Sequence, residues 1–84
     1  MSKREKLLNK LRNTTAAGAD ASDIDTLLTR YGFHLQRVRG SHHAYLYDDG
    51  ERKETIVVPV HNNHVKIVYV VEIVNLIDQL FPKG

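Results

Sequence analysis

The sequence predicts a single α+β domain in which helices cover one face of a three-stranded antiparallel sheet. Three observations predict this class. The chain has only 84 residues, which is enough for one hydrophobic core. Two segments with helical periodicity precede three strand-like segments separated by turn residues, and a third helical segment follows them. Because the chain has no cysteine, apolar packing rather than disulfides must stabilise the domain.

The first two helices are predicted from apolar spacing and from their end signals. Residues 3–13 place leucines at helical spacing among strong helix formers, and residues 14–21 are small and polar, which is typical of a connection. Ser22 is expected to cap a second helix that runs to Tyr31 and ends at Gly32, a residue type that accepts the left-handed turn after a helix. The apolar stripe of this second helix consists of Ile24, Leu27, Leu28 and Tyr31.

The first strand is predicted over residues 33–39, where apolar and polar residues alternate. Strict alternation places Phe33, Leu35 and the stem of Arg37 on one side of the strand. This pattern is typical of a strand with one buried face.

Two further strands follow with clear turn signals between them. Residues 40–41 are a Gly-Ser turn, residues 42–47 alternate again, and residues 48–51 are typical of a hairpin loop. The third strand is expected from about residue 54 to residue 60. Pro59 cannot donate a ladder hydrogen bond, so it marks this strand as an edge strand or as ending there. The two faces of the second strand are His43, Tyr45 and Tyr47 on one side and His42, Ala44 and Leu46 on the other.

Two signals disagree in the last segment. Residues 65–71 are rich in β-branched side chains and favour a strand by propensity. The apolar residues from Val70 onward recur with the helical period, and polar residues share the opposite face. Periodicity therefore predicts a helix from about residue 68 to residue 81, ended by Pro82. Its apolar positions are Val70, Ile73, Val74, Ile77, Leu80 and Phe81.

Charge is distributed unevenly along the chain. Residues 1–20 hold five Lys/Arg and two acidic residues, whereas residues 21–84 hold seven Lys/Arg and eight acidic residues. Residues 26–47 contain no Asp or Glu but do contain three arginines and three histidines. Such a segment attracts anions and suits phosphate binding, although three arginines are also compatible with an ordinary solvated surface.

Five histidines in so short a chain suggest either metal binding or acid–base chemistry. His42 and His43 are neighbours on a strand and point to opposite faces, so they do not share an ion. The segment 61–64 holds two histidines in a predicted loop without a nearby cysteine or paired acid. We therefore expect no metal site and no cofactor, and the sequence contains no serine triad, P-loop or glycine-rich dinucleotide turn.

His42 is the strongest candidate for acid–base chemistry. A histidine exchanges a proton near neutral pH, and this one follows the Gly-Ser turn with Arg37 and Arg39 just across it. A solvated surface histidine is the competing interpretation. The residues alone leave His34 and His43 as structural or solvated. They leave Tyr45 and Tyr47 as packing residues of the sheet, unless one of them stacks on a base.

A set of short motifs carries a resemblance to a known family. The motifs are Tyr31-Gly32-Phe33, Arg37 followed by Arg39-Gly40-Ser41-His42-His43-Ala44-Tyr45, then Val58-Pro59-Val60-His61, Lys66 and the apolar last helix. In this order and spacing they resemble the HicA toxin family of bacterial type II toxin–antitoxin systems, also called YcfA-like. The resemblance covers about residues 22 to 81.

The resemblance implies a fold and an organisation. The fold is a helix–three-strand–helix unit similar to double-stranded RNA-binding domains, here over residues 22–84. Residues 1–21 are then an N-terminal helical extension and linker.

The resemblance also implies an activity and partners. The family's activity is metal-independent endoribonuclease cleavage of mRNA, and its silencing partner is a HicB antitoxin, through which alone operator DNA would be contacted. By position, His42 matches the catalytic histidine, and Gly40 and Ser41 match the turn that presents it. The RNA-facing residues implied by the resemblance are Arg37, Arg39, Gly40, Ser41, His43 and Lys66.

A mechanism follows as a hypothesis. RNA carries its own nucleophile, the 2′-hydroxyl, so a ribonuclease needs a base, an acid and cations for the transition state. His42 is expected to act as base or acid, with Arg37, Arg39 or Lys66 stabilising the phosphate charge. His61 is a candidate for the second proton partner, and a loop histidine packed under the last helix is the alternative.

Two other classes of function stay open at this stage. The domain is compatible with a non-catalytic RNA-binding module and with a protein-interaction domain. No apolar stretch is long enough for a signal peptide or a membrane span, and cysteine is absent, so the cytoplasm is the expected location.

Overall fold

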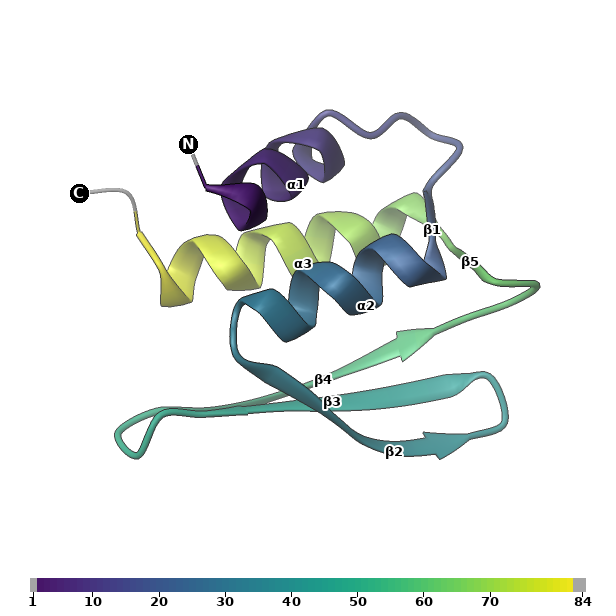
Figure 1. Ribbon diagram of the computed structural model, residues 1–84. Helices are drawn as coiled ribbons and strands as arrows, with labels where there is room; N and C mark the ends of the chain where they lie inside the picture. The colour runs from purple at the N-terminus through teal and green to yellow at the C-terminus, as the bar shows by residue number, and fades with distance from the viewer. Residues whose placement is uncertain (1, 83–84) are drawn as a thin grey trace.

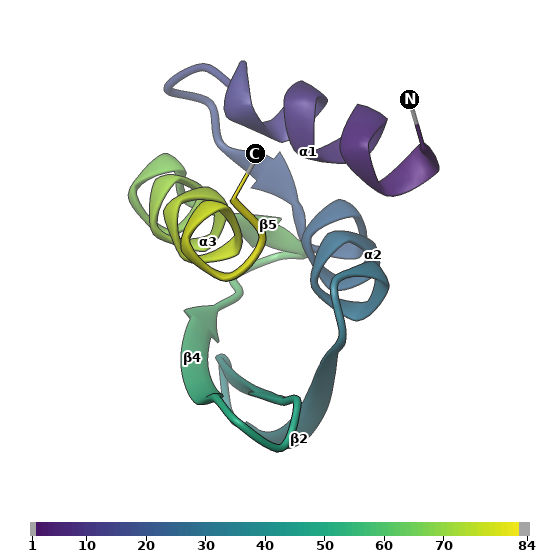
Figure 2. The same ribbon diagram turned by 90° about the vertical axis from the view of Figure 1, so that its left-hand side faces the viewer.

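The computed structural model describes residues 2–82, and its elements form three layers (Figure 1). The elements are α1 (Lys3–Arg12), β1 (Ala19–Asp20), α2 (Ala21–Arg30), β2 (Phe33–Arg39), β3 (His42–Asp48), β4 (Lys53–Pro59), β5 (His64–Val65) and α3 (Ile67–Leu80). Strands β2, β3 and β4 form an antiparallel sheet in that order. Helices α2 and α3 lie on one face of the sheet, and α1 lies across the two helices on their far side (Figure 2). This arrangement confirms the predicted α+β class and its extra N-terminal helix.

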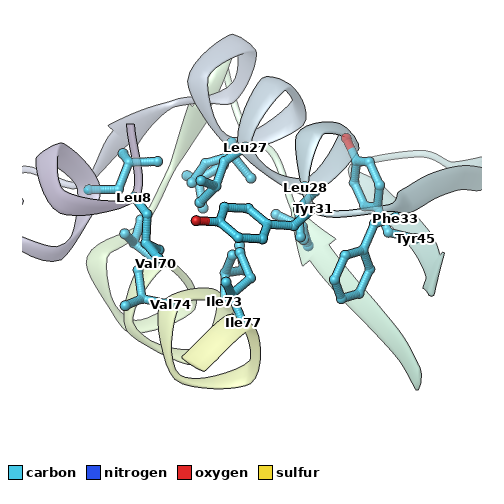
Figure 3. Close-up of a cluster of buried hydrophobic side chains, with 14 of the residues drawn as sticks. Leu8, Leu27, Leu28, Tyr31, Phe33, Tyr45, Val70, Ile73, Val74 and Ile77 are labelled. Atoms are coloured by element: carbon cyan, nitrogen blue, oxygen red, sulfur yellow. The ribbon is translucent and has the colours of Figure 1, made fainter. Parts of the chain in front are cut away.

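The core lies between the sheet and the helices (Figure 3). The predicted stripe of α2 and four of the predicted apolar positions of α3 are buried, because both helices turn these sides toward one another and toward the sheet. Helix α1 adds Leu8 and Leu11, which are 4% and 2% exposed. Burial of an apolar side chain of this size contributes roughly 1.5–3 kcal/mol, so these contacts are the main source of stability. The buried residues of α2 and α3 are Ile24, Leu27, Leu28, Val70, Ile73, Val74 and Ile77.

Helix α1 is held by polar contacts as well as by its leucines. Ser2 caps it in a reciprocal capping box with Glu5. The guanidinium of Arg12 makes two hydrogen bonds to the carboxylate of Asp78 on α3, at 2.6 and 2.8 Å. The guanidinium of Arg4 lies over the ring of Tyr31, 4.7 Å from its centroid. The first helix therefore belongs to the same packed unit as the other two.

The predicted start of α2 was wrong by two residues. The helix begins at Ala21 with Asp20 as its N-cap residue, and Ser22 lies inside the first turn. Tertiary pairing explains the difference, because the N–H of Ala21 donates to the carbonyl of Asn63 at 2.8 Å. The helix ends at Arg30, one residue before the predicted end, with Tyr31 as its C-cap residue. Gly32 comes next with a φ of +91°, in the left-handed conformation expected of it.

A β-bulge in β2 corrects the predicted faces of this strand. Leu35 pairs with Tyr45, but Arg37 pairs with Ala44, so Gln36 is an extra residue in β2. Residues directly opposite each other share a face of the sheet. Leu35 therefore lies on the helix side with buried Tyr45, whereas Arg37 lies on the other side with Ala44. Strict alternation predicted one shared side for the two residues, and the bulge separates them.

The sequence did not predict the short pairing of β1 with β5. Ala19 pairs with Val65, within what was expected to be a plain connection. Between β4 and β5 the chain reverses through Asn62 and Asn63, which have φ values of 52° and 60°. Asparagine tolerates this left-handed region better than most residues, and two such residues in succession are typical of a tight hairpin turn.

The last helix confirms periodicity over propensity. Helix α3 starts at Ile67, one residue before the predicted start, and only Val65 of the β-branched run is in a strand. Within residues 2–82, no helix is both long and apolar enough to cross a membrane.

Candidate nucleic-acid interface

His42 is the first residue of β3 and is exposed. The two-residue turn Gly40–Ser41 joins β2 to β3, and Gly40 has a φ of +59°. A methyl group at Gly40 would meet nothing within 4 Å, so the left-handed backbone rather than crowding favours glycine here. The turn places Arg39 directly opposite His42 in the antiparallel pairing. The predicted neighbourhood of imidazole and guanidinium groups across the turn is therefore present.

Arg37, Arg39 and His42 share the face of the sheet that points away from the helices. We call these three residues the basic face. Arg37 is opposite Ala44, which is two residues after His42 on the same strand, and all three members of the basic face are exposed. The bulge at Gln36 makes this possible, because regular alternation from Leu35 would have turned both arginines toward the helices.

The basic face is available for an anion. The ion pairs of the described residues involve Lys10, Arg12 and Arg52, and none of them involves Arg37, Arg39 or His42. Guanidinium groups bind phosphate through two parallel hydrogen bonds, and an imidazole beside them can accept or donate a proton. Phosphate binding next to proton transfer is therefore the chemistry that this face allows.

The end of β4 lies against the Gly40–Ser41 turn. The N–H of Val60 donates to the carbonyl of Ser41 at 2.7 Å, which brings the chain entering His61 to this corner of the sheet. His61 is exposed, and its backbone makes two hydrogen bonds with His64 at 3.0 and 2.9 Å. Because it is exposed, His61 does not pack beneath α3. That alternative from the sequence was wrong.

His43 and Lys66 lie at the same end of the molecule as the Gly40–Ser41 turn, but neither belongs to the basic face. His43 is half-buried and pairs with Val38 and Val58, so it points toward the helix side, opposite to His42. Lys66 is exposed and is the N-cap residue of α3. Helix α3 begins at the end of the molecule that carries the β2–β3 turn (Figure 1). The structure thus collects the predicted residues at one end but distributes them over two faces.

Sequence reasoning missed one polar pair in this region. The hydroxyl of Tyr45 donates to Oδ1 of Asp25 at 2.5 Å, and it links β3 to α2. Burial, followed by this hydrogen bond, raises the pKa of Tyr45. The alternation of residues 42–47 had identified Tyr45 only as a packing residue. No local signal in the sequence connects it to Asp25, which is 20 positions away.

A protein metal site requires several ligand side chains that converge on one point. Within residues 2–82, no three His, Asp or Glu side chains converge as a ligand set.

Comparison with known proteins identifies the family. A family model described as "HicA toxin of bacterial toxin-antitoxin" matches residues 21–79, which is more than half of the chain. The match begins at the start of α2 and ends one residue before the end of α3, so α1 lies outside it. No curated protein and no solved structure matches the chain.

Proposed function

This chain belongs to the HicA toxin family, one half of a bacterial toxin–antitoxin pair, and from that premise we propose that it is a metal-independent endoribonuclease of mRNA. One observation supports the proposal most directly. The exposed imidazole of His42 lies directly opposite Arg39, and Arg37 shares their face of the sheet.

The proposed reaction uses the 2′-hydroxyl of RNA as nucleophile. His42 removes the proton from this hydroxyl, or donates one to the leaving 5′ oxygen, as the oxygen–phosphorus bond forms and the phosphorus–5′-oxygen bond breaks. Acid–base help of this kind contributes about 10²–10⁴ in rate. Arg37 and Arg39 bind the phosphate oxygens and stabilise the negative charge that grows in the transition state.

We assign the other of these two proton transfers to His61. The hydrogen bond from the N–H of Val60 to the carbonyl of Ser41 brings the chain just before His61 to the turn that precedes His42. An exposed histidine at this corner is accessible to a leaving group on the substrate. Lys66, Gly40, Ser41 and His43 complete the proposed RNA-binding surface.

The proposed antitoxin is a HicB-like protein, and contact with operator DNA would occur only through it. We expect the activity in the cytoplasm, where mRNA is translated. An antitoxin that covers the basic face would block phosphate binding and proton transfer together.

The test replaces His42 with Ala and follows cleavage of a labelled RNA in the presence of EDTA. We expect cleavage and growth inhibition to be lost while the circular dichroism spectrum is unchanged. His34→Ala is the matched control, because His34 is another exposed histidine of the same sheet. It lies on β2 and pairs with Leu46, away from the Gly40–Ser41 turn. This variant should retain full activity.

Other results of this test would contradict the proposed role of His42 or favour one of the two alternative functions. RNA cleavage by the His42→Ala variant would show that His42 takes no part in the mechanism. An unmodified chain that shifts RNA in a gel without cutting it would support the non-catalytic RNA-binding module. A chain that neither binds nor cuts RNA would support the protein-interaction domain.

A further inference from the structure

A cavity of about 290 Å³ lies between the start of α2 and the helix-facing side of the sheet. Its apolar wall includes Leu35, Val58 and Val60. Leu35 is 47% exposed, although it lies on the same face as buried Tyr45, so an aliphatic surface is left uncovered at the mouth. The open mouth and apolar wall make this cavity accessible to a flat ligand from solvent.

The polar groups of the cavity come from three separate elements. Asp25 and Ser22 belong to α2, Asn63 to the turn before β5, and His43 to β3. The Tyr45 hydroxyl occupies one lone pair of Asp25 Oδ1 and fixes that carboxylate beside the cavity. A carboxylate has about four acceptor positions, so Asp25 retains acceptor capacity after this bond.

The cavity lies on the opposite side of the sheet from the basic face, but near the same end of the sheet. His43, in its lining, directly follows His42 in β3, and Val60, also in its lining, donates its N–H to Ser41 of the turn. The two sites lie on opposite sides of the sheet, so we expect an RNA strand to reach both by passing around the end of the sheet at the Gly40–Ser41 turn.

We infer that this cavity binds an unpaired guanine base of the substrate RNA, from a nucleotide next to the one that is cleaved. The inference rests on the proposed ribonuclease function. Unpaired bases are recognised by their polar edges and stacked through their flat faces, frequently on histidine or other planar groups. The aliphatic wall and the His43 ring provide surfaces for the faces of a base.

Guanine fits the polar lining better than the other three bases. It alone presents two adjacent N–H donors on its Watson–Crick edge, N1–H and the N2 amino group, to which a carboxylate is complementary. Ser22 and Asn63 supply donors for its O6 acceptor. A carboxylate near a polyanion is unfavourable by charge, and the hydrogen bonds that Asp25 would accept from a guanine offset that cost.

The test measures binding separately from cleavage. The probes are labelled five-nucleotide RNAs, all uridine except for a central guanosine, inosine or adenosine, and the protein is the full chain carrying His42→Ala. Fluorescence anisotropy should give a Kd for the guanosine RNA about tenfold lower than for the adenosine RNA. Inosine lacks the N2 amino group and should give an intermediate Kd.

Asp25→Asn and Asp23→Asn, each added to the same chain, form the matched pair of variants. The Asp25→Asn change keeps an oxygen for the Tyr45 hydroxyl but loses the paired acceptors, so the preference for guanosine should disappear. Asp23 is on the same helix but forms an ion pair with Lys10 at 3.3 Å, and it does not line this cavity. Its substitution should leave the preference unchanged.

The outcomes separate the two proposals. Equal affinity for the three RNAs, no binding to any of them, or a preference that survives Asp25→Asn would overturn the guanine site. Failure of the unmodified chain to cut these RNAs, with guanosine-selective binding retained, would instead overturn the ribonuclease and leave the guanine site supported.

Discussion

The two faces of the sheet differ sharply, although they are built from the same three strands. On the helix-covered face, Phe33, Tyr45 and Val58 are at most 3% exposed and form part of the core. On the opposite face, Arg37, Arg39 and His42 are exposed. The difference shows how one layer can supply stability from one side and chemistry from the other, because alternate residues of a strand point in opposite directions.

Two adjacent valines on β4 provide the most direct way to test this division, and the largest expected effect. Val58 is 1% exposed and Val57 is 48% exposed. Val58→Ala removes buried methyl groups and leaves a void, so it should lower the free energy of unfolding by about 2–3 kcal/mol. Val57→Ala should change it by less than about 0.5 kcal/mol. Urea denaturation measures both values, and equal losses would contradict the division into a buried and an open face.

The next effect concerns binding on the open face. Arg39→Ala should weaken binding of a single-stranded RNA by about tenfold and reduce the slope of log K against log salt by about 0.7, the value for one phosphate contact. Arg30→Ala is the matched control, because Arg30 is exposed at the end of α2 rather than on the sheet. Salt titrations by fluorescence anisotropy measure both quantities. An unchanged slope for Arg39→Ala would show that this arginine contacts no phosphate.

The smallest effect concerns the β3–β4 turn, at the end of the sheet away from His42. Backbone N–H groups of Arg52 and Glu51, followed by the Tyr47 hydroxyl, lower the pKa of Asp49. A carboxyl whose pKa is lower in the folded state stabilises the fold above its unfolded pKa of about 3.9, and this stabilisation is lost as the pH falls through the folded value. Asp49→Asn should therefore flatten the decline of stability on acidification.

The measurement for Asp49 is the midpoint of thermal unfolding between neutral pH and about pH 2. Glu51→Gln, in the same turn, is the control and should preserve the decline. If the Asp49→Asn profile followed that of the unmodified chain, the hydrogen bonds to Asp49 would not contribute to the acid dependence.

Much of the fold and part of the site were predictable from local pattern. The period of the apolar residues predicted α3 against the β-branched composition of its start, and Gly32 marked the end of α2 to within one residue. The motif around the turn predicted that Arg39 and His42 lie across from each other, because a two-residue turn fixes the register of a hairpin.

The sequence by itself determined the element types, the buried stripes and the hairpin that presents His42, since periodicity and turn chemistry depend on residues close in the chain. Only the tertiary structure decided that Arg37 joins the basic face, because the bulge at Gln36 is visible only in the pairing with β3. It also decided that Asp25 meets Tyr45 and that β1 pairs with β5. These contacts join residues distant in sequence, and the packing of α2 against the sheet, rather than any local preference, brings them together.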